Sequence, residues 1–304
     1  MFSLPIDPED LALIQSYGKE HKIPVIAIHS AGFYSYFRIN LPGNFPIVDT
    51  HPDSTATTDL RLLSPWPELS VFAADLTKNI ESLPDREHGH VPYVVLLLHY
   101  LEKWKELHGS PPVSYKDKKA FKEYVSAGAR IDNAEGGEEN FDEAASAVLK
   151  TVSAPSLASP VQAVFDYKPN DVCENTSLMF KQLTYIAHQY QVESESSFWI
   201  IADAIKQFYA KHKELPLPGS VPDMKALSNI YVQLQNIYKA KARQDVAEVL
   251  ETVRAHPAGK DIDVAEVETF CKNAAFIKLI HGVELSPANI QTIASMLLIH
   301  YHWR

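Results

Sequence analysis

The chain has 304 residues, of which 46% are hydrophobic, so it is long enough for one large domain or two ordinary ones with sizeable buried cores. Its formal net charge is −10. A nucleic-acid partner requires a basic face that replaces the counterions of the phosphates, so this acidic balance argues against DNA or RNA binding. Solubility or a basic protein partner suits such a surface better.

The cysteines and the apolar runs indicate a soluble chain from a reducing compartment. The two cysteines, Cys173 and Cys271, form no CxxC pair, which argues against a zinc or redox site. The first residues lack the basic segment of a secretory signal. The most apolar run, residues 91–101, is about half as long as a helix that spans a bilayer. We therefore expect a cytoplasmic or nuclear protein without membrane contact.

The first part of the chain predicts one helix followed by two strands. Residues 7–22 open on acidic positions and carry apolar residues at helical spacing. Residues 23–30, IPVIAIHS, form a continuous apolar run that is typical of a buried strand in a parallel sheet. Residues 31–40 alternate aromatic and small side chains, which predicts a second strand. This order is typical of the last helix–strand–strand part of an α/β domain.

A connector rich in proline and aspartate, residues 50–69, precedes a series of predicted helices. Within it, Asp59 and Arg61 are expected to form a structural ion pair. Residues 91–109 begin with a proline motif, end with glycine and are apolar all round in their first half, so this helix is expected to be buried. Further helices are predicted over residues 114–129, 140–152, 196–215, 223–255 and, as a final pair, 263–282. The predicted fold class is therefore mixed α/β followed by a predominantly α-helical body.

The longest predicted helical segment, residues 223–255, is expected to form one long helix or two and has an apolar stripe along one side. The stripe recurs at i, i+3 and i+4 spacing and comprises Leu227, Ile230, Tyr231, Leu234, Ile237 and Tyr238. The opposite face is polar, with Lys239, Lys241, Arg243 and Asp245. Such a stripe is more often part of a protein's own core than a surface for a partner. The alternative is a helix that also offers a face to another protein.

Motifs that carry catalysis are missing from the sequence. None of the 11 glycines occurs in a GxG or GxxxxGK loop, so no phosphate-binding site is predicted. His88 and His90 lack a third ligand in the sequence and fit a connector better than a metal site. Cys173 has acidic neighbours, which disfavour a reactive thiolate, and Cys271 is expected to be a small buried side chain. The residue chemistry points away from catalysis.

Several segments of the chain resemble one protein family in their order and spacing. They are IPVIAIHSAGFYSYFRI, HPD…DLRL…PWPEL, HVPYVVLLLHYLEKW, PVSYKDKKAFKEYV, ENFDEA, SSFWIIADAIKQF, GSVPDM…YVQLQNIYKAKARQDV and FCKNAAF. From about residue 7 to residue 282, this pattern is similar to the regulatory, catalytically silent subunit of the heterodimeric activating enzyme for the Nedd/Rub ubiquitin-like modifier. The resemblance implies that residues 1–69 are the remnant of a Rossmann-like, ThiF-type adenylation half-domain. It also implies that residues 70–285 are a mainly helical region related to the cysteine domain of the enzyme.

The resemblance implies a subunit that makes no bonds itself. In the family, the partner subunit holds ATP and Mg, adenylates the C-terminal glycine of the modifier and carries the thioester cysteine. This chain is then expected to have no catalytic, cofactor or metal site, and to dock on the catalytic subunit as a heterodimer that supports adenylation and thioester formation. The family's contacts with that subunit map here onto His90, Asp223, Met224, Leu227, Ile230, Tyr231, Leu234, Gln235 and Asn236.

The sequence departs from the family in three places. The N-terminal portion of the family's α/β half is absent, residues 177–192 are an insert, and residues 286–304 have no counterpart, so the chain resembles a form truncated at both ends. Two alternatives stay open. A fragment of a single-chain ubiquitin-activating enzyme would require a glycine loop and a cysteine flanked by basic residues. A free-standing helical scaffold would bind proteins other than activating-enzyme subunits.

Overall fold

The computed structural model describes residues 8–21, 24–31, 33–41, 44–52, 59–134, 136–153, 156–167 and 196–281. The chain divides into two units, one made of residues 1–48 and 277–304 and the other of residues 49–276. The division falls after Val48 and not near residue 69, because Leu60 and Leu62 are buried in the core of the second unit. Each unit is described by itself below.

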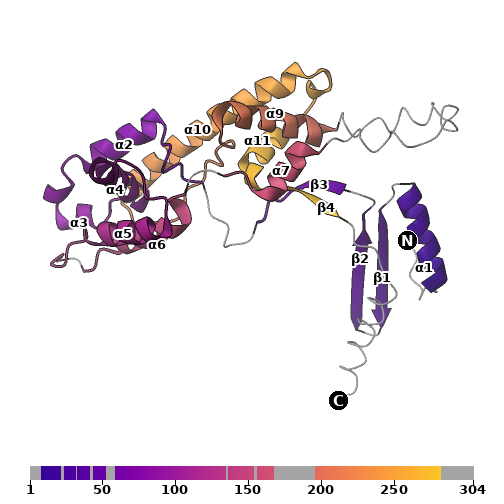
Figure 1. Ribbon diagram of the computed structural model, residues 1–304, viewed down its shortest axis with the longest axis horizontal. Helices are drawn as coiled ribbons and strands as arrows, with labels where there is room; N and C mark the ends of the chain where they lie inside the picture. Colours follow the sequence, from indigo (N-terminus) through magenta and orange to yellow (C-terminus); the bar gives the residue numbers. More distant parts are fainter. Residues whose placement is uncertain are drawn as a thin grey trace, which may run out of the picture. The chain divides into compact units, whose positions relative to one another are not determined.

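The described residues of the first unit form one helix and two separate pairs of strands (Figure 1). Its elements are α1 (Pro8–Glu20), β1 (Val25–Ala31), β2 (Tyr34–Asn40), β3 (Asn44–Val48) and β4 (Ile277–His281). Strands β1 and β2 form an antiparallel hairpin in which Ile28 lies opposite Phe37. Strands β3 and β4 are also antiparallel, with Phe45 opposite Ile280. The second pair therefore joins segments that lie far apart in the sequence.

Two expectations for these strands are corrected. Residues 23–30 were expected to form a buried strand of a parallel sheet, but β1 pairs antiparallel with β2, and Ile26 is 60% exposed. The short connection between the two strands permits a hairpin, whereas parallel strands require a long crossover. The final helical pair is also wrong in its second half, because residues 277–281 form β4. The register of β4 with β3 supplies backbone partners that the local sequence does not reveal.

The second unit is helical, which confirms the predicted helical body. Its elements are α2 (Pro67–Thr77), η1 (Ile80–Ser82), α3 (Asp85–His88), α4 (Tyr93–His108), α5 (Tyr115–Ser126), α6 (Glu139–Thr151), α7 (Ser159–Asp166), α9 (Ser197–His212), α10 (Ser228–Ala255), η4 (Pro257–Gly259), α11 (Val264–Lys272) and η5 (Ala274–Phe276). Helix α4 contacts α2, α5 and α6, whereas α10 contacts α2, α9 and α11. Figure 1 shows α10 running from the group around α4 to the group around α9. No helix among the described residues combines the length and the apolar character needed to cross a membrane.

Helix α4 forms because its apolar run is framed by suitable ends. Pro92 stands at the N-cap, where a missing N–H costs nothing, and Gly109 closes the helix in the left-handed conformation with a φ of 74°. The four residues from Val94 to Leu97 are completely buried. Every face of this half of the helix is therefore covered by a neighbour, as the sequence predicts.

Helix α10 begins five residues later than predicted, at Ser228 and not at residue 223. The backbone N–H of Lys225 donates to the Glu143 carboxylate at 2.8 Å, which gives that group a partner outside a helix. The Tyr231 hydroxyl donates to the carbonyl of Pro222 at 3.4 Å. These two contacts hold the segment before the helix, whose last residue, Leu227, has extended backbone angles.

His99 on α4 carries a pH-dependent contribution to stability. Burial, together with the positive charge of Lys103, lowers the pKa of this imidazole to about 4, and its Nε2 atom is buried without a hydrogen-bond partner. The unfolded chain therefore binds a proton near pH 6.5 that the folded chain refuses until about pH 4, so folding stability falls as the pH drops through this window.

We expect the variant His99→Leu to resist mild acid better than the unmodified chain. Between pH 7.5 and pH 5, the difference in unfolding free energy between the variant and the unmodified chain should change in favour of the variant by on the order of 1 kcal/mol. This figure is discounted for the partial exposure of the ring. Urea titrations followed by circular dichroism at the two pH values would measure both differences. Identical differences at pH 5 and pH 7.5 would contradict the prediction.

Candidate functional site

Metal-ligating side chains do not cluster in the described part of the chain. No three His, Cys, Asp or Glu side chains there lie close enough to hold a metal ion. Cys271 is buried, and this burial raises the pKa of its thiol to about 12, so the side chain stays protonated and unreactive. This agrees with the prediction of a small buried side chain. Cys173, the other cysteine considered above, lies outside the described residues.

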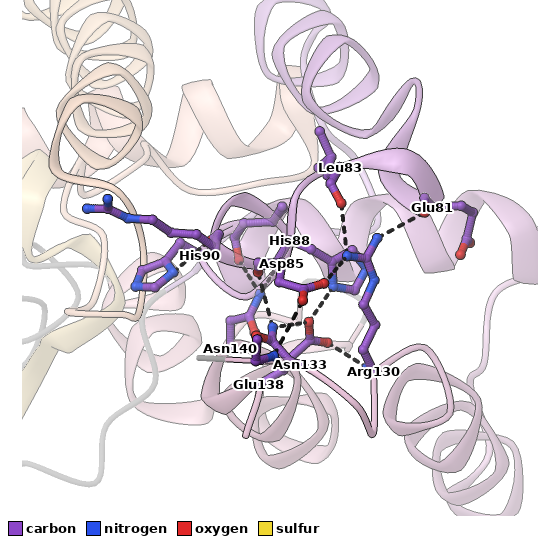
Figure 2. Close-up of polar contacts among 12 residues, drawn as sticks. Glu81, Leu83, Asp85, His88, His90, Arg130, Asn133, Glu138 and Asn140 are labelled. Carbon is purple, nitrogen blue, oxygen red and sulfur yellow. Dashed lines mark hydrogen bonds and ion pairs between the residues drawn. The ribbon is translucent and has the colours of Figure 1, made fainter. Parts of the chain in front are cut away.

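A buried polar cluster lies where α3, α6 and the loop before α6 meet (Figure 2). It is made of the buried residues His88, Glu138 and Asn140 and the half-buried Asn133. The Glu138 carboxylate receives three contacts: His88 Nδ1 at 2.7 Å, the Asn133 side-chain amide at 2.9 Å and the backbone N–H of Arg130 at 2.7 Å. His88 and Glu138 have side chains only 2% and 0% exposed, so this carboxylate has exchanged its water for protein donors.

The far side of the cluster is held by Arg130. Its guanidinium donates to the Asp85 carboxylate at 2.8 Å and to the backbone carbonyls of Leu83 and Glu81, each at 2.9 Å. The backbone N–H of Ala134 and the side chain of Arg130 both donate to Asp85 and hold the pKa of its carboxyl below the usual range. These contacts fasten the loop before α6 to the turns before α3.

The two histidines of the HGH motif thus occupy different environments, which fits the predicted connector better than a shared metal site. His88 faces inward onto Glu138, and its ring stacks on Phe141 with ring centroids 5.1 Å apart. His90 faces the other way, and its Nδ1 lies 2.7 Å from the carbonyl oxygen of Arg86. The tight turn through Gly89 separates the two rings.

A charged patch lies beside the buried cluster and consists of His90, Glu139 and Lys225. The Lys225 ammonium lies 2.9 Å from a Glu139 oxygen. The hydrogen bond and charge of Lys225, with a smaller contribution from His90, hold the pKa of the Glu139 carboxyl below its usual range. The three residues come from the turn after α3, the first turn of α6 and the segment before α10, so the fold brings together charges that are remote in sequence.

The apolar floor next to the charged patch is formed by the start of α4 and the start of α10. Burial raises the pKa of Tyr93 to about 12, with Glu143 and Tyr231 as nearby contributors. Tyr231 packs against the main core cluster with part of its side chain exposed. The next residue, Val232, and Asn236, one turn further along α10, are exposed at i, i+4 spacing and therefore lie on one face of the helix.

The structure places the nine predicted contact residues in three groups by exposure. Leu234 and Met224 are buried in the core; Asp223 and Asn236 are exposed; His90, Leu227, Ile230, Tyr231 and Gln235 are half-buried. Leu234 is 0% exposed, so its side chain supports the surface from below and offers nothing to another molecule. The segment before α10 and His90 lie close together, since Lys225 and His90 both act on Glu139.

The sequence reasoning missed Glu139, Lys225 and Val232. The pairing of Glu139 with Lys225 joins positions too far apart to be matched from one sequence. Val232 left a local signal, because a valine on the polar side of an amphipathic helix is unusual, and it is 50% exposed. This signal could have extended the predicted surface to the face that also carries Asn236.

Comparisons with known proteins agree with the resemblance drawn from the segments above. No family model matches the chain. It is 32% identical over 274 residues to the NEDD8-activating enzyme E1 regulatory subunit of Xenopus laevis. The aligned region covers 86% of this chain and 47% of the Xenopus protein. It is also 32% identical over 269 residues to the regulatory subunit AXR1 of Arabidopsis thaliana, covering 86% of this chain and 45% of AXR1.

A more distant relative is the regulatory subunit from Saccharomyces cerevisiae, with 24% identity over 262 residues, 84% of this chain and 52% of the yeast protein. The chain therefore spans about half the length of each of these relatives. Over most of its own length, this chain is homologous to the regulatory subunits of NEDD8-activating enzymes of animals, plants and yeast.

Proposed function

We propose that the chain is a non-catalytic subunit of a NEDD8-activating enzyme, which docks on the catalytic subunit and so supports adenylation and thioester formation of the modifier. The observation that carries this proposal is homology to regulatory subunits across 86% of the chain. Two features support it. The sequence contains no glycine loop for a triphosphate, and Cys271 is buried as a thiol. ATP and Mg are then bound by the partner subunit.

We propose that docking uses the charged patch together with the exposed start of α10. This surface combines half-buried Tyr231, exposed Val232 and exposed Asn236 with the charges of Lys225 and Glu139. An aromatic and apolar centre with a polar rim is the usual composition of a protein interface. Met224 and Leu234 act by keeping this surface in place from within the core.

We also propose that α1, β1 and β2 are a remnant of a Rossmann-like adenylation half-domain, as the resemblance implies for residues 1–69. The apolar side chains of Ile26, Ile28, Phe37 and Ile39 support this, because they form an exposed face of a hairpin that a larger domain would cover.

A cytoplasmic or nuclear location is proposed on the cysteine usage alone.

A double variant with two added charges tests the docking surface. Val232→Glu combined with Asn236→Glu should weaken binding to the catalytic subunit by about 30-fold or more, because two carboxylates would be desolvated without partners at the centre of the interface. The dissociation constant would be measured by isothermal titration calorimetry with the catalytic subunit from the same organism. Both positions are exposed, so the fold should be retained.

Gln244→Glu combined with Ala247→Glu is the matched control, since it adds the same charge at exposed positions further along α10. This control should bind like the unmodified chain. Equal affinity of the test variant and the control would count against the proposed surface. ATP–pyrophosphate exchange by the chain alone would support a single-chain enzyme fragment, and binding to other proteins but not to the catalytic subunit would support a free-standing scaffold.

A further inference from the structure

The buried polar cluster and the charged patch are joined residue by residue along the chain. Glu138 is completely buried, and its neighbour Glu139 is exposed in the patch. His88 is buried, and His90 stands two residues later in the patch. Glu139 is therefore adjacent in sequence to one partner of the 2.7 Å contact between His88 Nδ1 and Glu138 Oε1, and His90 stands two residues after the other partner.

Asn140 closes the link between the cluster and the turn that carries His90. Its side-chain amide donates to the carbonyl of His88 at 2.9 Å and to the carbonyl of Val91 at 3.1 Å. These two carbonyls bracket His90. The backbone on both sides of His90 is therefore held by one buried side chain, which is itself 0% exposed.

The view in Figure 2 separates the two ends of this arrangement. His90 lies on one side of Glu138, and the side chain of Arg130 lies on the other. The hydrogen bonds of the Arg130 side chain go to Glu81, Leu83 and Asp85, which all precede the segment from His88 to Val91. One end of the network thus reaches the patch, and the other end joins the loop before α6 to the turns before α3 and to Asp85, the first residue of α3.

We infer that Glu138 is a positioning residue for the docking surface, which rests on the proposed docking function. With its three donors, the carboxylate fixes the turn that carries His90 and the helix start that carries Glu139. The Glu139 carboxylate is then held in one position, where it forms the ion pair with the ammonium of Lys225. A surface whose charges are already ordered loses less conformational freedom on binding, so its complex is tighter.

Glu138→Gln tests this inference, because glutamine keeps the shape of the side chain but replaces one acceptor oxygen with an NH₂ group that meets donors. We expect binding to the catalytic subunit to weaken about 5- to 20-fold. Arg130→Lys is the matched control at the other end of the network, and it should lower the melting temperature without changing the affinity. Both would be measured by calorimetric titration and thermal unfolding on the full chain.

A double-mutant cycle distinguishes positioning from a merely structural role. If Glu138 acts through the patch, the effect of Glu138→Gln should fall below about twofold in a Lys225→Ala background, since the ordered charge is already gone. Asn140→Leu, which releases the carbonyls of His88 and Val91, should also weaken binding much less in the Lys225→Ala background than in the unmodified chain. It replaces Glu138→Gln in the cycle if that variant does not fold.

Four outcomes would decide the matter. An unchanged affinity of folded Glu138→Gln, or an effect of equal size with and without Lys225, would overturn the positioning role while leaving the docking proposal intact. Failure of the unmodified chain to bind the catalytic subunit would overturn the docking proposal itself, and the inference with it. A loss of affinity that disappears in the Lys225→Ala background would support it.

Discussion

Replacing Leu234 with aspartate is expected to unfold the helical unit. Leu234 is 0% exposed and belongs to the main core cluster, with α10 as its scaffold. Removing a buried leucine costs about 2–5 kcal/mol, and a buried carboxylate without a partner adds several more. Since most domains are stable by only about 5–15 kcal/mol, a loss of this size removes most of the folded population.

Circular dichroism and thermal unfolding of Leu234→Asp would measure this loss, with Asn236→Asp as the control. Asn236 lies two positions further along the same helix and is exposed, so its variant should keep the unfolding free energy within about 0.5 kcal/mol. A folded and cooperative Leu234→Asp chain would show that this position faces solvent. The comparison also separates loss of fold from loss of docking, which a variant at Leu234 alone would confuse.

Replacing Arg61 with methionine should cost about 3–5 kcal/mol of unfolding free energy. The Arg61 side chain is 5% exposed, and its Nε donates to Asp59 at 2.7 Å, which confirms the predicted pair. The rest of the guanidinium donates to the Glu214 carboxylate and to the carbonyl of Leu215. Methionine would leave Glu214 half-enclosed without its cation, and would release the link between residues 59–64 and the end of α9.

Arg61→Lys is the informative companion variant. Lysine keeps the charge, but one ammonium cannot reach Asp59, Glu214 and Leu215 in the planar arrangement that the guanidinium provides. Urea titrations should therefore show that Arg61→Lys loses unfolding free energy relative to the unmodified chain, but less than Arg61→Met does. If Arg61→Met were as stable as the unmodified chain, the cluster would be a surface feature that contributes little.

Local patterns in the sequence predicted the elements whose formation is local. Helix α4 was predicted with its ends because a proline, an apolar run and a glycine lie within one segment, and the structure confirms it. The burial of Leu234 and Tyr238 likewise follows from the stripe on α10, read as core. In both cases the information lies within a few turns of helix.

Elements that depend on distant partners were not predictable in the same way. Strand β4 exists because Ile277–His281 pairs with Asn44–Val48, at the other end of the described chain. The late start of α10 depends on Glu143, which accepts from the N–H of Lys225. The charged patch joins Glu139 to Lys225 for the same reason. A single sequence does not reveal which remote polar groups meet.

The rate at which the buried Cys271 thiol is chemically labelled would report how often the helical unit opens. A protonated sulfur enclosed by its neighbours cannot attack a maleimide until the surrounding helices separate. In a chain carrying Cys173→Ser, the labelling rate would thus depend on how often the structure around Cys271 opens. A tightly bound catalytic subunit should slow that rate, so that assembly can be timed by a single chemical modification with no attached dye or tag.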